Sequence, residues 1–255
     1  MPRRTLPLAL LALLALVALA QSAHADPDAL WKIVSEKCVP NEREYGQPAP
    51  CALVDLERGQ AQGYVVLKDI VGDTQYLLMP TAKITGIEDP AVLAPGATNY
   101  FAAAWQERHY TVEAAKVALP RDALSLAINS TSGRTQNQLH IHIDCVRADV
   151  RAALQRQLAS IGDDWAPLAE PLVGHRYRAI RVSGDDLGGF DPFQRLAAGV
   201  PGARDAMGSH TLAVVGAVLA GAPGFVILDD QADPATGDRG SAEELQDHAC
   251  ALARP

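Results

Sequence analysis

The chain has 255 residues, of which 48% are hydrophobic, so it is long enough to bury a core as one large domain or two small ones. Its formal net charge is −8 at pH 7. This charge excludes bulk electrostatic attraction to nucleic acid, so an anionic ligand would have to be held by local hydrogen-bond donors.

The amino terminus carries the pattern of a secretory signal. Arg3 and Arg4 precede an apolar run over 6–20, and Ala23-His24-Ala25 follows it. The run is shorter than the roughly 20 apolar residues of a membrane-spanning helix, and small residues at Ala23 and Ala25 suit a signal peptidase. We therefore expect residues 1–25 to be a signal peptide cleaved after Ala25, with an uncleaved membrane anchor as the alternative.

An even number of cysteines fits an exported protein with disulfide bonds. The four are Cys38, Cys51, Cys145 and Cys250, and they permit three pairings. Cys38 and Cys51 bracket a polar segment over 39–50 that a bridge would order, with a stabilisation of about 3 kcal/mol. Cys145 and Cys250 would then join a histidine-bearing strand to the last helix. Small buried thiols are the alternative.

The first half of the chain is predicted to form two strands, a helix and two further strands. A short helix over 28–37 ends at Cys38, and the runs 63–70 and 74–79 predict a hairpin around a turn at 71–73. A helix follows over 99–110. A half-buried strand over 124–128 precedes the histidine-bearing strand over 138–145, and a helix over 149–161 closes this unit.

The second half repeats this order more weakly. Strands are predicted over 177–182, 211–218 and 224–228, with a helix over 192–198. The last helix begins at Ser241, where Glu244 completes a capping box, and it runs to Leu252. These elements predict an α+β fold divided into 1–25, a catalytic unit over 26–162, and a unit over 163–255 that packs on the first. The third segment is either a degenerate second copy or an extension.

The strand over 138–145 carries the chemistry. Alternate side chains of a strand point the same way, so His140, His142 and Asp144 share one face, opposite Leu139 and Ile141. Three interpretations compete for this face. It is a polar surface, a zinc site with a third ligand from elsewhere, or a nucleophilic site in which one imidazole attacks phosphorus.

The residues upstream favour the nucleophilic site. Short polar and flexible residues that can hold phosphate oxygens precede the histidines: Asn129, Gly133, Arg134, Gln136 and Asn137. Asn129, Gln136, His140 and His142 stand at the spacing of the histidine triad superfamily, and 74–80 resembles the end of a preceding strand in that superfamily. The chain is therefore similar to histidine triad hydrolases and transferases.

This resemblance implies a role for each site residue. His142 would be the nucleophile, forming a covalent nucleotidyl-histidine without any metal or other cofactor, and His140 would orient or polarise the phosphate. The phosphate would be steadied by Asn129, Gly133, Arg134, Gln136 and Asn137. Asp69 stands near the place where the superfamily has an acidic residue that binds the ribose hydroxyls.

Two residues depart from the superfamily. Asp144 replaces the third histidine of the triad, and Gln75 replaces an earlier histidine. With both departures the chain resembles one branch of the superfamily, the bacterial CDP-diacylglycerol pyrophosphatase family. Separate blocks that carry this resemblance lie at 31–34, 38–41, 63–69, 75–81, 127–130, 133–137, 140–143 and 243–248.

The resemblance implies hydrolysis of CDP-diacylglycerol to CMP and phosphatidate through a covalent cytidylyl-histidine. It implies a protein of the bacterial inner membrane with its catalytic part in the periplasm, acting in phospholipid metabolism. CDP-diacylglycerol in the membrane would be its partner, with no nucleic acid and no obligate protein partner. Two alternatives stay open: a zinc-dependent phosphohydrolase using His140 and His142, and an exported nucleotide- or lipid-binding protein without turnover. We expect packing or surface roles for His109, His175, His210 and His248.

Overall fold

The structure is a computed structural model that describes residues 26–253. The predicted signal peptide, residues 1–25, lies outside the described residues. Within residues 26–253, no helix is both long enough and apolar enough to cross a membrane.

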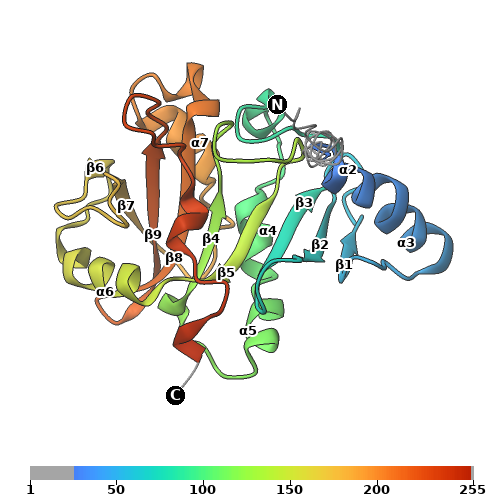
Figure 1. The fold of residues 1–255 in the computed structure, drawn as a ribbon, viewed down its shortest axis with the longest axis horizontal. Coiled ribbons are helices and arrows are strands. Elements are labelled where there is room, and N and C mark those ends of the chain that lie inside the picture. The colour runs from blue at the N-terminus through green and yellow to red at the C-terminus, as the bar shows by residue number, and fades with distance from the viewer. Residues whose placement is uncertain (1–25, 254–255) are drawn as a thin grey trace, which may run out of the picture.

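A single antiparallel sheet of nine strands organises this part of the chain (Figure 1). The strand order is β1-β2-β3-β5-β4-β8-β9-β7-β6. The strands are β1 (Leu53–Asp55), β2 (Tyr64–Lys68), β3 (Tyr76–Pro80), β4 (Leu124–Ile128), β5 (Ile141–Cys145), β6 (Ala166–Pro167), β7 (Arg178–Ser183), β8 (His210–Leu219) and β9 (Ala222–Gln231). With the helices that cover it, this sheet confirms the predicted α+β class.

The helices are short and lie on both faces of the sheet. They are α2 (Ala29–Ile33), a π-helical turn (Val34–Cys38), α3 (Val39–Tyr45), α4 (Tyr100–Gln106), α5 (His109–Ala115), α6 (Ala148–Gln157) and α7 (Pro192–Gly199). Single 3-10 turns complete the set at Pro90–Leu93, Arg121–Ala123, Leu158–Ser160, Ala203–Asp205, Met207–Ser209, Ala242–Leu245 and Ala251–Ala253.

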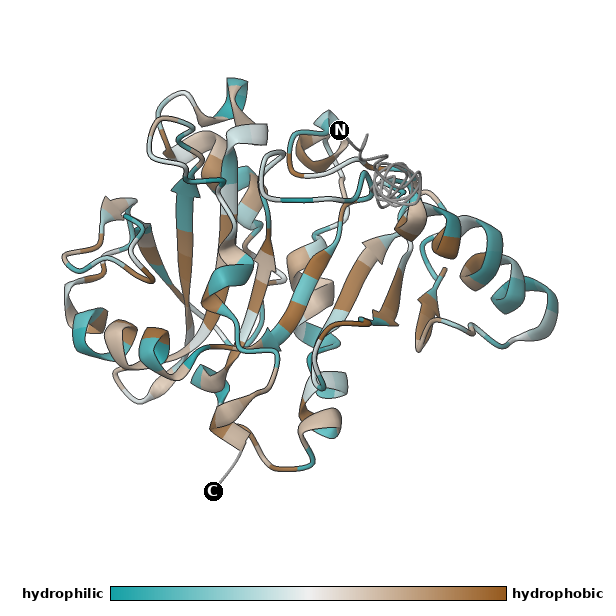
Figure 2. Cartoon of the chain, in the orientation of Figure 1, coloured by the Kyte–Doolittle hydropathy of each residue, from teal (hydrophilic) through white to brown (hydrophobic). Residues whose placement is uncertain are grey.

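One face of the sheet buries a broad apolar core. The residues of β4, β5 and β8 that point to this face, among them Leu126, Ile143 and Val214, pack against Phe101 of α4 and Phe193 of α7. In Figure 1, α4 lies behind β4 and β5, whereas the segment after β9 crosses in front of the central strands. Figure 2 shows hydrophobic residues along the strands and mostly hydrophilic residues on α3.

The opposite face buries two separate apolar clusters. Helices α2 and α3 cover β2 and β3, where Val34 and Val39 pack against Leu77 and Met79. Helix α6 and the segment after β9 cover β8 and β9, with Leu154 and Leu245 in contact with that part of the sheet. The strand β5 runs between these two clusters, and on this face it carries polar side chains.

The two halves of the chain share this sheet. Strand β4 pairs with β8 from Ser125↔Val215 to Ile128↔Leu212, so the sheet is continuous across residue 162. The division at that residue and the idea of a degenerate second copy stay predictions. The histidine triad-like detail of the fold is likewise a prediction.

Both predicted disulfides are present. Cys38 bonds Cys51, and Cys145 bonds Cys250 across a sequence separation of 105 residues. The predicted hairpin is also confirmed, because β2 and β3 pair from Tyr64↔Pro80 to Lys68↔Tyr76.

The prediction that the first helix ends at Cys38 was wrong. The helical backbone continues through a π-helical turn into α3 and ends only at Gly46, which adopts the left-handed conformation at φ 62°. Pro40 falls in the first turn of α3, where the missing N–H of a proline costs little. The helix predicted over 99–110 is divided between α4 and α5 by a turn at Glu107 and Arg108.

Two further predictions were wrong near the site. The strand over 124–128 is buried along its whole length rather than half-buried, because residues after β9 cover its polar face. The last helix does not form. Ser241 is followed only by the 3-10 turn Ala242–Leu245, with no side-chain cap, and its hydroxyl donates instead to Asn129 Oδ1 at 3.2 Å.

Candidate active site

The histidine strand lies in the middle of the sheet. His142 pairs with Leu77 of β3 on one side and with Ala127 of β4 on the other. Its side chain therefore points into the gap between the two apolar clusters of that face. His140 and His142 are 8% and 5% exposed, and their ring centroids lie 5.0 Å apart. The strand thus presents two neighbouring imidazoles that are almost removed from water.

The segment after β9 covers these imidazoles because its backbone is attached to the sheet at several points. Glu243 N–H donates to Asn129 Oδ1 at 3.2 Å, and residues Val146 and Gln246 form a bridge. The Gln246 amide donates to the carbonyl of His142 at 3.2 Å, and Asp247 N–H donates to the carbonyl of Cys145 at 2.9 Å. With the disulfide, these bonds fix the segment over β4 and β5.

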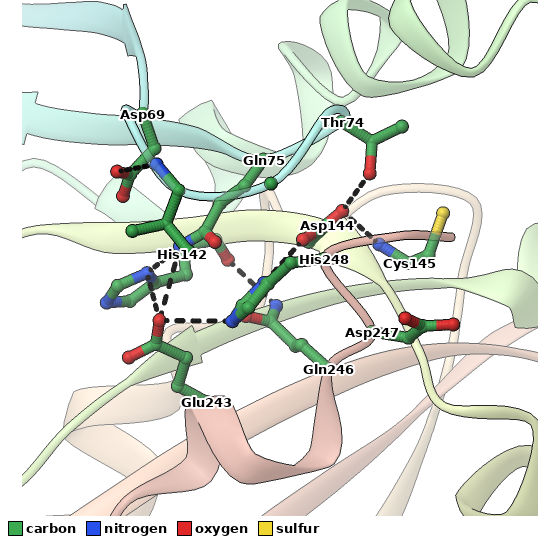
Figure 3. Close-up of polar contacts among 12 residues, drawn as sticks. Asp69, Thr74, Gln75, His142, Asp144, Cys145, Glu243, Gln246, Asp247 and His248 are labelled. Carbon is green, nitrogen blue, oxygen red and sulfur yellow. Dashed lines mark hydrogen bonds and ion pairs between the residues drawn. The ribbon is translucent and has the colours of Figure 1, made fainter. Parts of the chain in front are cut away.

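Glu243 enters the site from this segment and faces His142 (Figure 3). Its Oε1 lies 3.4 Å from His142 Nδ1 and accepts a hydrogen bond from Gln75 Nε2 at 3.3 Å. Its Oε2 accepts from Asn129 Nδ2 at 3.0 Å. Burial raises the pKa of Glu243, but hydrogen bonds from His248 and Asn129 outweigh it and hold that pKa below its ordinary value. Glu243 is therefore a carboxylate.

His248 joins Glu243 to Asp144. Its Nδ1 donates to Asp144 Oδ2 at 2.8 Å, and its Nε2 lies 3.4 Å from Glu243 Oε1. The hydrogen bond to Asp144 and then that to Glu243 raise the pKa of His248 to about 10, so the ring is an imidazolium at neutral pH. Asp144 is fully buried and also accepts from Thr74 Oγ1 at 2.6 Å. Asp144, which stands at the position of the triad's third histidine, thus binds His248 through a salt bridge.

His142 has the opposite electrostatics. Burial lowers its pKa to about 3, although the Glu243 carboxylate raises it, so the ring is neutral at neutral pH. Its Nδ1 contacts the amide of Gln75, and its Nε2 is buried without a hydrogen-bond partner. A neutral imidazole with one uncommitted nitrogen is the form that a nucleophile requires.

His140 is also neutral, because burial lowers its pKa. Its Nδ1 lies 2.6 Å from the carbonyl oxygen of Gln138, which can only accept. The ring proton therefore sits on Nδ1, and Nε2 presents a lone pair rather than an N–H. In this tautomer His140 can accept a hydrogen bond at Nε2.

The structure brings some of the predicted site residues together. Asn129 and Gln75 contact Glu243, and Asp144 contacts His248, so these three predicted residues belong to the group of side chains around His142. Asp69 is drawn near His142 in Figure 3, where its Oδ1 accepts from Val71 N–H at 2.9 Å.

Four predicted phosphate contacts are engaged elsewhere. Gly133 lies against the backbone of Gly240, where an added Cβ would come within 2.6 Å of the carbonyl oxygen. Arg134 makes two bonds of 2.6 Å to Glu88. Gln136 bonds the backbone of Asp26 and Leu30, and Asn137 N–H donates to Pro27.

The sequence analysis missed Glu243 as a site residue and assigned His248 a packing role. Residues 243–248 contain three carboxylates, one amide and one histidine within six positions. That density next to Cys250 was the available signal. It was obscured because the same residues also fit a capped amphipathic helix.

Zinc ligation by His140 and His142 lacks a compact donor set. Among residues 26–253, the group of three acidic or histidine donors close enough to hold an ion is His175, Asp230 and Asp238, which does not include either site histidine.

The model of a family described as CDP-diacylglycerol pyrophosphatase (CDH) matches residues 25–254. It covers nearly the whole chain, including β5 and the segment after β9, so it confirms the resemblance stated from separate sequence blocks.

Proposed function

The chain belongs to the CDP-diacylglycerol pyrophosphatase family and is a hydrolase of CDP-diacylglycerol; from this premise we propose that it works by covalent catalysis at His142. The observation that supports the proposal is the pair His142 and Glu243. Nε2 of the imidazole is uncommitted, while Nδ1 lies 3.4 Å from a carboxylate oxygen. A carboxylate beside one ring nitrogen holds the proton there and leaves the lone pair on the other nitrogen, as it does for the general-base histidine of serine proteases.

Glu243 sets the tautomer of His142. A carboxylate only accepts hydrogen bonds, so it favours a proton on Nδ1 and a lone pair on Nε2. Gln75 Nε2 faces both His142 Nδ1 and Glu243 Oε1. A half-turn of the amide exchanges its oxygen and nitrogen, so that the oxygen accepts from Nδ1–H and supports the same tautomer, and the donation from Gln75 to Glu243 is then given up. In that orientation His142 Nδ1–H is also the donor for Gln75 Oε1, which is otherwise buried without a partner.

In the first step Nε2 attacks the phosphorus of the cytidylyl group. A nitrogen–phosphorus bond forms, and the bond from phosphorus to the bridging oxygen breaks, so that phosphatidate leaves with the electron pair. The imidazole then carries a positive charge with its proton still on Nδ1. Glu243 Oε1 balances this charge. Because the charge develops in the transition state, a carboxylate already fixed beside it stabilises that state more than the ground state.

In the second step water attacks the same phosphorus. The nitrogen–phosphorus bond breaks, CMP is released, and one proton of the water passes to solvent. His140 presents a lone pair at Nε2, so we propose that it accepts a hydrogen bond from this water and orients it. This role differs from donation to a phosphoryl oxygen, which would need an N–H at that nitrogen.

Asp144 and His248 are proposed to hold Glu243 rather than to react. Asp144 keeps His248 protonated, and the imidazolium holds the Glu243 carboxylate in front of His142. The function of the third triad histidine is thereby taken by an aspartate that recruits a histidine from the segment after β9.

The phosphate contacts remain part of the proposal. The charge of Arg134 contributes to the lowered pKa of His140. We propose that the guanidinium of Arg134, which pairs with Glu88, also contacts a phosphate of the bound substrate. The side chain of Gln136 would contact substrate only after release of residues 26–30, whereas Asn137 is exposed and only its backbone N–H is bonded to that segment. Because His142 is only 5% exposed, binding has to displace a neighbouring side chain before phosphorus reaches Nε2.

We also propose export to the periplasmic side of the inner membrane, where the lipid-linked substrate lies. Two disulfides suit an oxidising compartment. Peptide mapping of the amino terminus of the protein purified from membranes would test whether residues 1–25 are removed.

Trapping the intermediate tests the mechanism. Wild-type protein is mixed briefly with CDP-diacylglycerol labelled in the cytidine, denatured and examined for bound label. We expect an acid-labile label on wild type and none on His142→Ala, with CMP and phosphatidate as products. Wild-type turnover without any label would contradict the covalent step.

Stereochemistry at phosphorus gives a second test that does not depend on trapping. Two successive displacements restore the configuration of a chiral phosphorothioate substrate, whereas direct attack by water inverts it. Retention supports the nitrogen–phosphorus intermediate, and inversion excludes it.

A further inference from the structure

A second cluster of acidic and histidine side chains lies apart from the histidine strand. His175 Nδ1 is 2.7 Å from Asp238 Oδ2 and 3.7 Å from Asp230 Oδ2. One donor atom from each of these residues lies within 4.8 Å of the other two. Glu244 Oε1 also lies 3.7 Å from His175 Nδ1, but it is not part of the group whose donors all lie within 4.8 Å of one another.

Asp230 places a buried carboxylate oxygen in this cluster that no hydrogen-bond donor reaches. The residue is 6% exposed, and its Oδ2 is buried without a hydrogen-bond partner. A buried carboxylate without a partner is costly, and three carboxylates around one imidazole leave excess negative charge. Both observations point to a bound cation.

We infer that His175, Asp230 and Asp238 bind a divalent transition-metal ion such as Zn²⁺. One imidazole nitrogen and two carboxylate oxygens form a donor set that zinc accepts, with water in the fourth position. Tetrahedral ligands at about 2.0 Å from the ion lie roughly 3.3 Å from one another. The observed separations of 2.7 to 3.7 Å around His175 Nδ1 bracket this value.

The surroundings give the ion a path and a backbone frame. His175, Asp230 and Asp238 line a cleft of ≈ 440 Å³ that opens to the surface. Two bridges fix the loops that present the ligands, Leu172↔His175 and Asp233↔Asp238. Tyr177 donates to Glu244 Oε1 at 2.8 Å, which orients that carboxylate beside His175.

The proposed ion site also adjoins the segment after β9, which carries Glu243. Glu244 follows Glu243 in the 3-10 turn Ala242–Leu245, so the two neighbouring carboxylates serve different sites. Glu243 faces His142, whereas Glu244 faces His175. Binding of the ion to His175 would therefore fix a side chain that contacts this turn, while the ion remains outside the reaction itself.

The test is calorimetric titration of Zn²⁺ into full-length protein without a histidine tag, after removal of metal by a chelator and dialysis. We expect one ion per chain in the wild type. Asp230→Asn should weaken binding on the order of 100-fold, since even outer-layer partners of a metal cost 10- to 100-fold. Because Asp230 is buried, Asp238→Asn, at the rim with 14% side-chain exposure, is a second variant that should fold.

Controls separate this site from the histidine strand and from surface carboxylates. His142→Ala should keep one ion per chain, and so should Asp205→Asn, which alters an exposed carboxylate elsewhere. Zn²⁺ should raise the Tm of wild type but not of Asp238→Asn. The inference is overturned by absence of binding to wild type, by undiminished binding to both ligand variants, by loss of binding in His142→Ala, or by tighter binding of Mg²⁺ than of Zn²⁺.

Discussion

His248 Nδ1 lies 2.8 Å from Asp144 Oδ2, although the two residues stand 104 positions apart in the chain. The contact joins the end of the histidine strand to the segment after β9, and the next link, from His248 to Glu243, returns to His142. Asp144, His248, Glu243 and His142 therefore follow one another in a single path of contacts, and each link can be broken separately.

Glu243→Gln removes the carboxylate that sets the tautomer of His142 and balances its charge. We expect kcat to fall on the order of 10²- to 10⁴-fold, with a smaller change in KM. Steady-state kinetics with CDP-diacylglycerol measure both, and Glu243→Asp should restore part of the rate. Glu57→Gln, at an exposed position, is the matched control and should keep the wild-type rate. An unchanged kcat in Glu243→Gln would remove Glu243 from the mechanism.

His248 gives stability a dependence on alkaline pH. Its pKa is raised from 6.5 to about 10 by Asp144 and Glu243. The stabilisation is therefore fully present below pH 6.5 and is lost as the pH rises through about 10. Denaturant unfolding of wild type between pH 6 and 10.5 should show this decline. His248→Gln should abolish it, whereas His109→Gln, with a 51% exposed side chain, should keep it. Parallel curves for wild type and His248→Gln would contradict the raised pKa.

Gly72 controls the position of His248 from the β2–β3 turn. A Cβ at Gly72 would come within 2.5 Å of His248 Cβ and of its carbonyl oxygen. Gly72→Ala should therefore displace His248 and lower kcat. Its backbone, at φ +69°, also adds strain of about 1 to 2 kcal/mol.

Gly59→Ala separates these two effects. Gly59 has φ +81° but nothing within 4 Å of the added Cβ. Gly59→Ala should lower the free energy of unfolding about as much as the backbone strain in Gly72→Ala does, while keeping the wild-type kcat. Equal kinetic losses in Gly59→Ala and Gly72→Ala would show that contact with His248 is unimportant.

The two disulfides should differ in their effect on turnover. Replacing Cys145 and Cys250 by serine releases a loop of 105 residues and should cost about 4 to 5 kcal/mol. It should also lower kcat, because Cys250 holds the segment that carries His248. Replacing Cys38 and Cys51 should cost about 3 kcal/mol, and kcat should not change in assays well below the Tm. Activity retained by the Cys145→Ser/Cys250→Ser protein would show that hydrogen bonds alone fix the segment.

Local patterns predicted the elements whose stability is local. The β2–β3 hairpin, β4, β5, and the strands and helix of the second half follow alternation and turn residues that lie within each segment. The spacing of Asn129, His140 and His142 likewise directed attention to the strand on which the proposed site is built. The function followed from that spacing together with Gln75 and Asp144, which the family match supports.

The errors occurred where distant residues decide the structure. Ser241 and Glu244 fit a capping box, but the hydroxyl of Ser241 is used by Asn129 and the carboxylate of Glu244 by Tyr177. These partners lie more than 60 positions away, so no local pattern contains them. For the same reason Glu243 and His248 could not be assigned to the site before β4, β5 and the segment after β9 were placed together.

The sheet shared by both halves makes the histidine strand dependent on residues that it does not touch. A chain cut after residue 162 would leave β4 as an open edge, because its partner β8 lies beyond the cut. Open edges recruit strands from other molecules. Separately produced pieces 26–162 and 163–255 should therefore aggregate alone, yet recover hydrolysis when refolded together, since the β4–β8 ladder supplies their recognition surface.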